Sequence, residues 1–130
     1  MGLFVLEGSP VTLTTTLHDK REAILNIKWV YNQTVNVVHY LPKHKDLEVD
    51  DPYKGRVEFN ETDFSLTLKN PQRSDSGLYT AVVDIRGKAA ETAASYELTV
   101  LGECVFYFFM RVGVYAHPWD YFTLVLLFVF

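Results

Sequence analysis

Histidine, cysteine and carboxylate side chains are the groups in this sequence that could ligate a metal or catalyse a reaction. The four histidines, His18, His39, His44 and His117, show no spacing typical of metal ligands. The nearest pair, His39 and His44, falls at the end of an expected strand and in the loop after it. Cys104 is the only cysteine and has no evident base to activate it. No glycine-rich phosphate loop occurs, so the sequence predicts no enzyme, no cofactor and no metal site.

The segment 44–51, HKDLEVDD, is rich in carboxylates, which are the ligands of calcium loops. Calcium loops present several oxygen ligands from one turn of the chain. This segment lacks the glycine and the bidentate glutamate at the spacing that an EF-hand requires. We therefore expect 44–51 to be a solvated connection between two strands, without a bound ion.

The bulk composition bounds the fold and excludes some partners. The chain has 130 residues, nearly half of them apolar, which suits one domain with a substantial core. Its net charge of −4 is spread without a basic block, so no nucleic-acid partner is expected. A single cysteine excludes an intrachain disulfide. No secretory signal is visible, and Leu6 stands where N-myristoylation would need serine or threonine.

Alternating apolar and polar residues predict a series of short strands up to about residue 101. Within 10–17, for example, Val11, Leu13 and Leu17 alternate with threonines, which is the pattern of a half-buried strand. Turn residues recur at the short intervals typical of an antiparallel β-sandwich. No helix is expected before residue 101, apart from a single turn within 70–77. The expected strands cover residues 10–17, 23–31, 35–41, 55–60, 64–70, 77–85 and 94–100.

The composition changes after residue 101. Residues 102–130 hold more than half of the aromatic side chains and form a hydrophobic tail. A membrane span needs about 20 apolar residues, whereas Arg111, Pro118 and Asp120 interrupt this segment. Three alternatives stay open for the tail: a truncated or mis-spliced end, a membrane-associating segment, or an extra packed element. The expected organisation is a β domain over 1–101 followed by the tail.

Four residues at characteristic spacings indicate the type of sandwich. Trp29 lies in the middle of an expected strand and faces the core. The stretch RSDSGLYTA (73–81) contains an Asp-x-Gly-x-Tyr-x frame, in which Tyr79 buries its ring and returns its hydroxyl to the backbone. The order and spacing of Trp29, Arg56, Asp75 and Tyr79 resemble those of an immunoglobulin variable-type domain. The resemblance implies an ion pair of Arg56 with Asp75, which as a partly exposed pair would contribute about 1 kcal/mol or less.

The inter-sheet disulfide usual in such domains is missing. Alternation places Thr15 at one bridge position, and the Asp-x-Gly-x-Tyr-x frame places Ala81 at the other. Losing a disulfide typically costs about 2–5 kcal/mol, so the apolar core must compensate. An inward Thr15 hydroxyl also needs a hydrogen-bond partner, because an unsatisfied one costs about 1–3 kcal/mol. The predicted fold is an all-β, variable-type antiparallel sandwich that lacks this disulfide.

Longer stretches resemble one receptor family. Residues 55–101, in which DSGLYTA leads through a variable loop to SYELTVL, and residues 27–40, IKWVYNQTVNVVHY, are similar to the membrane-distal domain of the signalling lymphocytic activation molecule (SLAM) family. Distal domains of that family commonly lack the disulfide. The resemblance covers about residues 3–101 and implies adhesion through strands G, F, C and C′, the GFCC′ face. Family members normally continue into a second domain and a membrane span, which 102–130 do not resemble.

Alternation along the strands predicts which side chains form this face. Since Trp29 and Tyr79 point into the core, their neighbours along the strands point outward. The loop 86–92 is a further candidate contact, because binding residues concentrate on loops. Both signs of charge occur on the face, which permits self-complementary pairing in a two-fold dimer. The predicted outward residues are Lys28, Val30, His39, Leu78, Thr80, Val82, Asp84, Arg86, Ser95, Glu97 and Thr99.

Several functions are compatible with the sequence. The first is an immune cell-surface adhesion module that binds a like or related immunoglobulin domain, homophilically or heterophilically. The second is a soluble truncated isoform or decoy of such a receptor. Membrane association of a receptor would depend on a missing or truncated C-terminal segment. A lectin-like module is the third, although strand 77–85 offers no outward arginine and Arg86 comes late. Two sequons, at Asn32 and Asn60, are predicted glycosylation sites in turns.

Overall fold

A computed structural model describes residues 2–17 and 23–103 of the chain. Nine strands and two short 3-10 helices account for most of this part. The strands are β1 (Gly2–Leu6), β2 (Val11–Leu13), β3 (Ile24–Tyr31), β4 (Val35–Leu41), β5 (Asp46–Val49), β6 (Val57–Phe59), β7 (Leu66–Leu68), β8 (Gly77–Ile85) and β9 (Glu91–Leu101). The helices are η2 (Asp51–Tyr53) and η3 (Arg73–Asp75), and the second is the single turn expected within 70–77.

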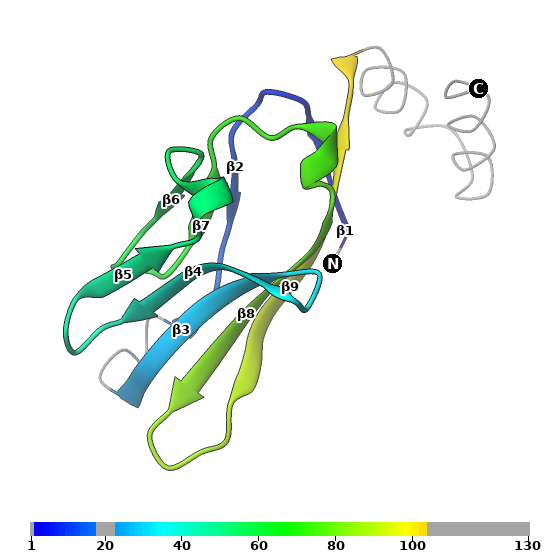
Figure 1. The fold of residues 1–130 in the computed structure, drawn as a ribbon. Helices are drawn as coiled ribbons and strands as arrows, with labels where there is room; N and C mark the ends of the chain where they lie inside the picture. Colours follow the sequence, from blue (N-terminus) through cyan, green and yellow to red (C-terminus); the bar gives the residue numbers. More distant parts are fainter. Residues whose placement is uncertain (1, 18–22, 104–130) are drawn as a thin grey trace.

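The strands form two sheets that face each other (Figure 1). The larger sheet has six strands in the order β1-β9-β8-β3-β4-β5, and the smaller has three in the order β2-β7-β6. Neighbouring strands run antiparallel except β1 and β9, which are parallel from Gly2↔Glu97 to Leu6↔Leu101. The all-β sandwich predicted from the sequence is confirmed.

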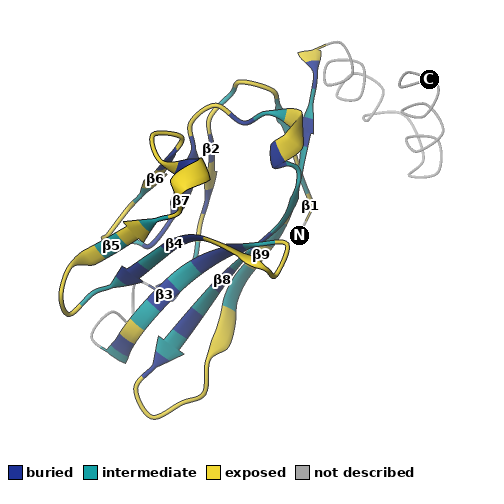
Figure 2. Ribbon diagram, viewed as in Figure 1, coloured by how far each residue is buried: buried dark blue, intermediate teal, exposed yellow. Residues whose placement is uncertain are grey.

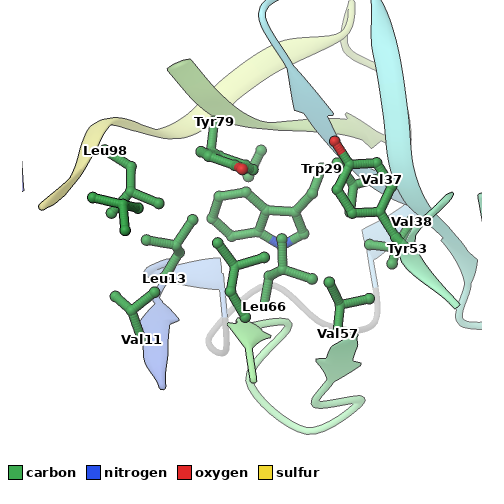
Figure 3. Packing of buried hydrophobic residues seen from close by; sticks show 13 residues of the cluster. Val11, Leu13, Trp29, Val37, Val38, Tyr53, Val57, Leu66, Tyr79 and Leu98 are labelled. Atoms are coloured by element: carbon green, nitrogen blue, oxygen red, sulfur yellow. The ribbon is translucent and has the colours of Figure 1, made fainter. Parts of the chain in front are cut away.

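Buried residues alternate with more exposed ones along the strands (Figure 2). The buried side chains pack together between the two sheets. Trp29 on β3 and Tyr79 on β8 lie fully buried at its centre, against Leu13 and Leu66 of the smaller sheet (Figure 3). The Trp29 indole nitrogen donates a hydrogen bond to the backbone oxygen of Phe64 at 3.0 Å. This bond satisfies the one polar atom of the buried ring and ties β3 to the chain just before β7.

Two polar contacts secure the corner before β8. The Tyr79 hydroxyl donates to the backbone oxygen of Asp75 at 2.6 Å, as the sequence frame predicts. One guanidinium nitrogen of Arg56 reaches both carboxylate oxygens of Asp75, at 2.7 and 2.8 Å. The Asp75 side chain is only 8% exposed, whereas that of Arg56 is 43% exposed. Asp75 is therefore more buried than a partly exposed ion pair implies. Removal of the Arg56 guanidinium would leave the Asp75 carboxylate largely shielded from solvent and without its charged partner.

The two bridge positions show how the sandwich is built without a disulfide. Ala81 is fully buried and lies opposite Trp29 in the pairing of β8 with β3. Thr15 lies two residues beyond the end of β2 and is partly buried. Its hydroxyl donates to the backbone oxygen of Asp63 at 3.1 Å, so the partner that an inward Thr15 needs is present.

The structure corrects the sequence prediction in several places, of which three matter most. The segment 44–51 is not only a solvated connection, because β5 occupies 46–49 and pairs with β4. Strand β1 was not expected at all, although it pairs with β9 over five residues. Strand β2 covers 11–13 rather than 10–17 because only three of its residues pair with β7. The alternatives for the tail concern 104–130, which lie outside the described residues.

Candidate binding face

The outer surface of the six-stranded sheet carries the side chains that the sequence placed on a binding face. Along β8, Tyr79, Ala81, Val83 and Ile85 are buried, while the intervening side chains are partly exposed. A strand of pleated sheet sends successive side chains to opposite faces. The outward residues of β8 are therefore Leu78, Thr80, Val82 and Asp84, as predicted.

Cross-strand register joins these positions to neighbours on β3, β4 and β5. Lys28 on β3 lies opposite Val82 on one side and His39 on the other. His39 in turn lies opposite Glu48 of β5. Directly opposed residues on one face of a sheet lie close enough for their side chains to interact. A continuous row therefore crosses four strands, and its last member, Glu48, was not predicted.

Two further rows lie on one side of this one. Thr80 lies opposite Ser95 and Val30, and Leu78 lies opposite Glu97. Val30 is on the outer side by its register, but the residue is only 8% exposed and offers little contact area. Thr99 continues along β9 and is partly exposed.

At the other end of the face, Asn26 and Asp84 form a hydrogen-bonded pair. The Asn26 amide nitrogen donates to a carboxylate oxygen of Asp84 at 2.7 Å. Asn26 was missed in the sequence, although it stands two residues before Lys28 and the alternation that placed Lys28 also places Asn26 outward. The hydrogen bond fixes the direction of the Asp84 carboxylate on the face. Arg86 is exposed at the start of the β8–β9 turn, beyond the last outward residue of β8.

The sequon at Asn32 sits at the edge of the face. Asn32 is exposed in the turn between β3 and β4, and its side-chain oxygen accepts a hydrogen bond from the Leu78 backbone at 2.9 Å. A Cβ at Gly77 would approach this oxygen and a ring carbon of Tyr31 to 2.7 Å, at a φ of +152° that side chains rarely adopt. The absence of a side chain at Gly77 therefore allows the β3–β4 turn to pack closely against the start of β8.

The sequon at Asn60 lies on the other sheet, directly after β6. Asn60 is exposed, and its side-chain oxygen accepts a hydrogen bond from the Thr62 backbone at 2.8 Å. This local bond is an Asx-turn, which orders the loop 61–63. The two sequons are thus on opposite sheets, one beside the outer face of β8 and one remote from it.

The described residues were compared with the requirements of a metal site and of a membrane-spanning helix. Across 2–17 and 23–103, no group of three or more histidine, cysteine or acidic side chains is arranged to hold a metal ion. In the same residues, neither short helix has the length or apolar character needed to traverse a membrane.

Comparison with protein families defines the class of the domain. Residues 2–101 match the immunoglobulin V-set domain model, and the chain belongs to this family. V-set domains are recognition domains rather than enzymes, and the arrangement of sheets described above is theirs.

Solved structures show the same fold at low sequence identity. The first immunoglobulin-like domain of human CD48 matches with a TM-score of 0.67 and 20% identity, over 79% of this chain and 83% of that chain. CD84 of the SLAM family matches with a TM-score of 0.66 and 16% identity, over 79% and 98%. The CD2-binding domain of CD58 matches with a TM-score of 0.57 and 18% identity, over 76% and 52%. At these identities the likeness establishes the fold alone.

Proposed function

We propose that this chain is an immune cell-surface adhesion or recognition module that binds a like or related immunoglobulin domain. The binding surface is the outer face of the six-stranded sheet, hereafter the outer face. The observation that carries the proposal is the register, which brings outward residues of β9, β8, β3, β4 and β5 into one continuous surface. Its predicted contact residues include Lys28, His39, Thr80, Val82 and Ser95.

The outer face is suited to protein recognition because its framework is rigid. Every second residue of β8 is buried in the core, so the intervening side chains project from a fixed backbone. A preorganised surface loses less conformational entropy on binding than a flexible loop. The face also mixes apolar Val82 with polar Thr80 and charged Lys28, as is usual for interfaces that form between soluble partners.

The finer assignment to the SLAM family rests on two supports. One is the resemblance of 27–40 and 55–101 to the distal domains of that family, including the missing disulfide. The other is the structural likeness to CD48 and CD84. The proposal places the domain at the cell surface and Asn32 and Asn60 as glycosylated residues. Attachment of a glycan at Asn32 would then limit the edge of the outer face beside Leu78.

A binding screen tests this function. The full chain is presented to a panel of V-set extracellular domains, and every binder is measured again with Val82→Trp, which adds bulk to the outer face without charge. Thr12→Trp is the matched control, because Thr12 is an exposed strand residue of the smaller sheet. We expect Val82→Trp to weaken binding by about tenfold or more, or 1.4 kcal/mol, and Thr12→Trp to leave it unchanged. The absence of any binder, or equal loss with both variants, would contradict the proposal.

A further inference from the structure

Two turns at one end of the six-stranded sheet carry a group of basic side chains. Strands β4 and β8 both run antiparallel to β3, so the turns that follow them leave the sheet at the same end (Figure 1). These turns, residues 42–45 (PKHK) and 86–90 (RGKAA), contain no acidic residue. Their four lysines and arginines are exposed (Figure 2). This group, hereafter the basic pole, consists of Lys43, Lys45, Arg86 and Lys88.

The basic pole differs from other lysines and arginines of the domain in its ion pairing. Across residues 2–17 and 23–103, four other basic side chains each lie within 3.4 Å of a carboxylate: Lys54, Arg56, Lys69 and Arg73. In the same residues, no side chain of the basic pole forms a salt bridge. Four positive charges gathered at one end of the sheet are therefore available to a ligand from outside the domain.

Both turns hold these side chains on hydrogen-bonded backbone. In the β4–β5 turn, the His44 amide donates to the backbone oxygen of Leu41 at 3.2 Å. In the β8–β9 turn, the Lys88 amide donates to the backbone oxygen of Ile85 at 3.0 Å, and Gly87 has a φ of +80°, which the third position of a type II turn requires. Fixed turns lose less conformational entropy on binding than flexible loops do.

The spacing of the two turns suits an extended chain of negative charges. Strands β4 and β8 flank β3, and neighbouring strands lie about 4.8 Å apart, so the turns begin about 10 Å from each other. A small anion would contact one turn, whereas a polymer with repeated anionic groups would span both. Arginine and lysine both bind tetrahedral oxyanions, arginine with two parallel hydrogen bonds and lysine as a point charge. A sulfated polysaccharide carries such groups along an extended chain.

The composition of the turns favours a polysaccharide over two other polyanionic partners. A segment that binds a membrane surface combines basic residues with large apolar ones, and a site for single-stranded nucleic acid presents aromatic rings on which bases stack. Residues 42–45 and 86–90 contain no leucine, isoleucine, phenylalanine, tyrosine or tryptophan. Their apolar members are one proline and two alanines, which suit neither purpose.

Carboxylates on the adjoining strands restrict a polyanion to the basic pole. Asp46 and Glu48 of β5 point outward, because Leu47 and Val49 of the same strand pack against the core. Asp84 occupies the last outward position of β8. Since like charges repel, an anionic chain would lie across the two turns and not along the outer face. The basic pole is therefore a surface separate from the outer face.

We infer that the basic pole binds a sulfated polysaccharide. The inference goes beyond the proposed function and does not depend on it, because it concerns other residues and another class of ligand. The net charge of the chain is −4, so the domain as a whole repels a polyanion and the attraction must be local. Binding of basic side chains along a linear polyanion releases its counterions, so the affinity should fall steeply as the salt concentration rises.

Heparin serves as the probe for this class of ligand. Its binding to the full chain is measured by surface plasmon resonance at about 0.15 M salt and at higher salt, and circular dichroism confirms that each variant folds. Two variants each remove the charges of one turn, and a control removes the same charge from two exposed lysines outside the pole. The variants are K43Q/K45Q and R86Q/K88Q, and the control is K54Q/K69Q.

We expect each pole variant to weaken heparin binding about tenfold, and the control to change it by less than about twofold, because its lysines already pair with carboxylates. Hyaluronan, which carries carboxylates but no sulfate, should bind more weakly than heparin, as should phosphatidylserine vesicles and single-stranded DNA. Val82→Trp on the outer face should leave heparin binding unchanged.

Four results would overturn the inference. They are the absence of heparin binding, equal loss in the control and the pole variants, loss in only one pole variant, and binding of hyaluronan, vesicles or DNA as tight as that of heparin. Loss of heparin binding with Val82→Trp would likewise contradict a separate surface. Failure of the proposed function appears elsewhere, as a panel in which no V-set domain binds the chain.

Discussion

The two faces of β8 differ in what each residue can tolerate, although they share one backbone. On the inner face, Tyr79 and Ala81 are fully buried against the other sheet. On the outer face, Thr80 and Val82 are only partly covered and have neighbours from the same sheet. Alternate residues of one strand therefore contribute to different properties: the inward residues to stability and the outward residues to binding. Substitutions on the inner face should therefore change the free energy of unfolding, and those on the outer face should change binding.

The largest effect is expected at Trp29, at the centre of the inner face. Trp29→Ala removes a fully buried ring and leaves the backbone oxygen of Phe64 without its donor. Deletion of a buried tryptophan side chain costs about 3–5 kcal/mol, enough to unfold much of the population of a marginal domain. Urea unfolding followed by circular dichroism measures the loss. A decrease below about 1 kcal/mol would show that the inner face does not carry the stability.

The next largest effect on stability is expected at the Arg56–Asp75 ion pair. Arg56→Ala leaves the Asp75 carboxylate, which is 8% exposed, without its guanidinium partner. Breaking a fully buried pair costs about 3–5 kcal/mol, and the exposure of Arg56 reduces this to about 1–3 kcal/mol. Lys69→Ala is the control, because its 3.4 Å pair with Glu58 is exposed on both sides. Equal changes in the urea midpoint for the two variants would show that burial of Asp75 does not make its ion pair more stabilising than an exposed one.

Tyr79→Phe removes one hydroxyl and leaves the buried ring in place. The lost hydrogen bond to Asp75 should reduce the free energy of unfolding by about 1 kcal/mol at neutral pH. Burial raises the pKa of Tyr79 well above its ordinary value, so the folded chain keeps this proton in alkali. The unfolded chain releases the proton above about pH 10, and stability therefore falls as the pH rises further. Urea titrations of both proteins from neutral to alkaline pH should show a smaller fall in Tyr79→Phe, and identical slopes would contradict this account.

The smallest effect on stability is expected on the outer face. Lys28→Ala removes a partly exposed side chain between Val82 and His39. The free energy of unfolding should change by no more than about 0.5 kcal/mol. Binding of the proposed partner should instead change, in rate and in salt dependence, because Lys28 lies at the centre of the face. Calorimetric unfolding and surface plasmon resonance on the same preparation measure the two effects separately. A large loss of stability would contradict the claim that outward residues contribute little to folding.

The sequence predicts the centre of this domain well because its strands alternate clearly. The Asp-x-Gly-x-Tyr-x frame placed Tyr79 and Ala81 inward, and alternation from these anchors placed Thr80 and Val82 outward; the burial pattern of β8 agrees. Alternation is informative where one face of a strand lies in the core and the other in solvent, because apolar residues then face the core and polar residues face solvent.

The edges of the sheet were harder to predict for physical reasons. In β5 the two outward residues are Asp46 and Glu48, and charged residues beside Asp50 and Asp51 favour a loop. Pairing with β4 overrides this weak local preference. Strand β1 depends on a parallel partner about 90 residues away in the sequence, β9, which no local pattern reveals. Asp46 and Glu48 were therefore missed as outward residues of the large sheet, because their placement depends on assigning β5 correctly.

The most direct test of the central claim compares two lysines on opposite sheets. Lys28 lies on the outer face, and Lys69 lies after β7 of the smaller sheet, 3.4 Å from Glu58. The rate of chemical acetylation at each is measured by mass spectrometry, with and without the V-set partner that the binding screen returns. Binding through the outer face should slow acetylation of Lys28 by about tenfold, equivalent to 1.4 kcal/mol of protection, and leave Lys69 unchanged. Protection of Lys69 with Lys28 still fully reactive would contradict the account.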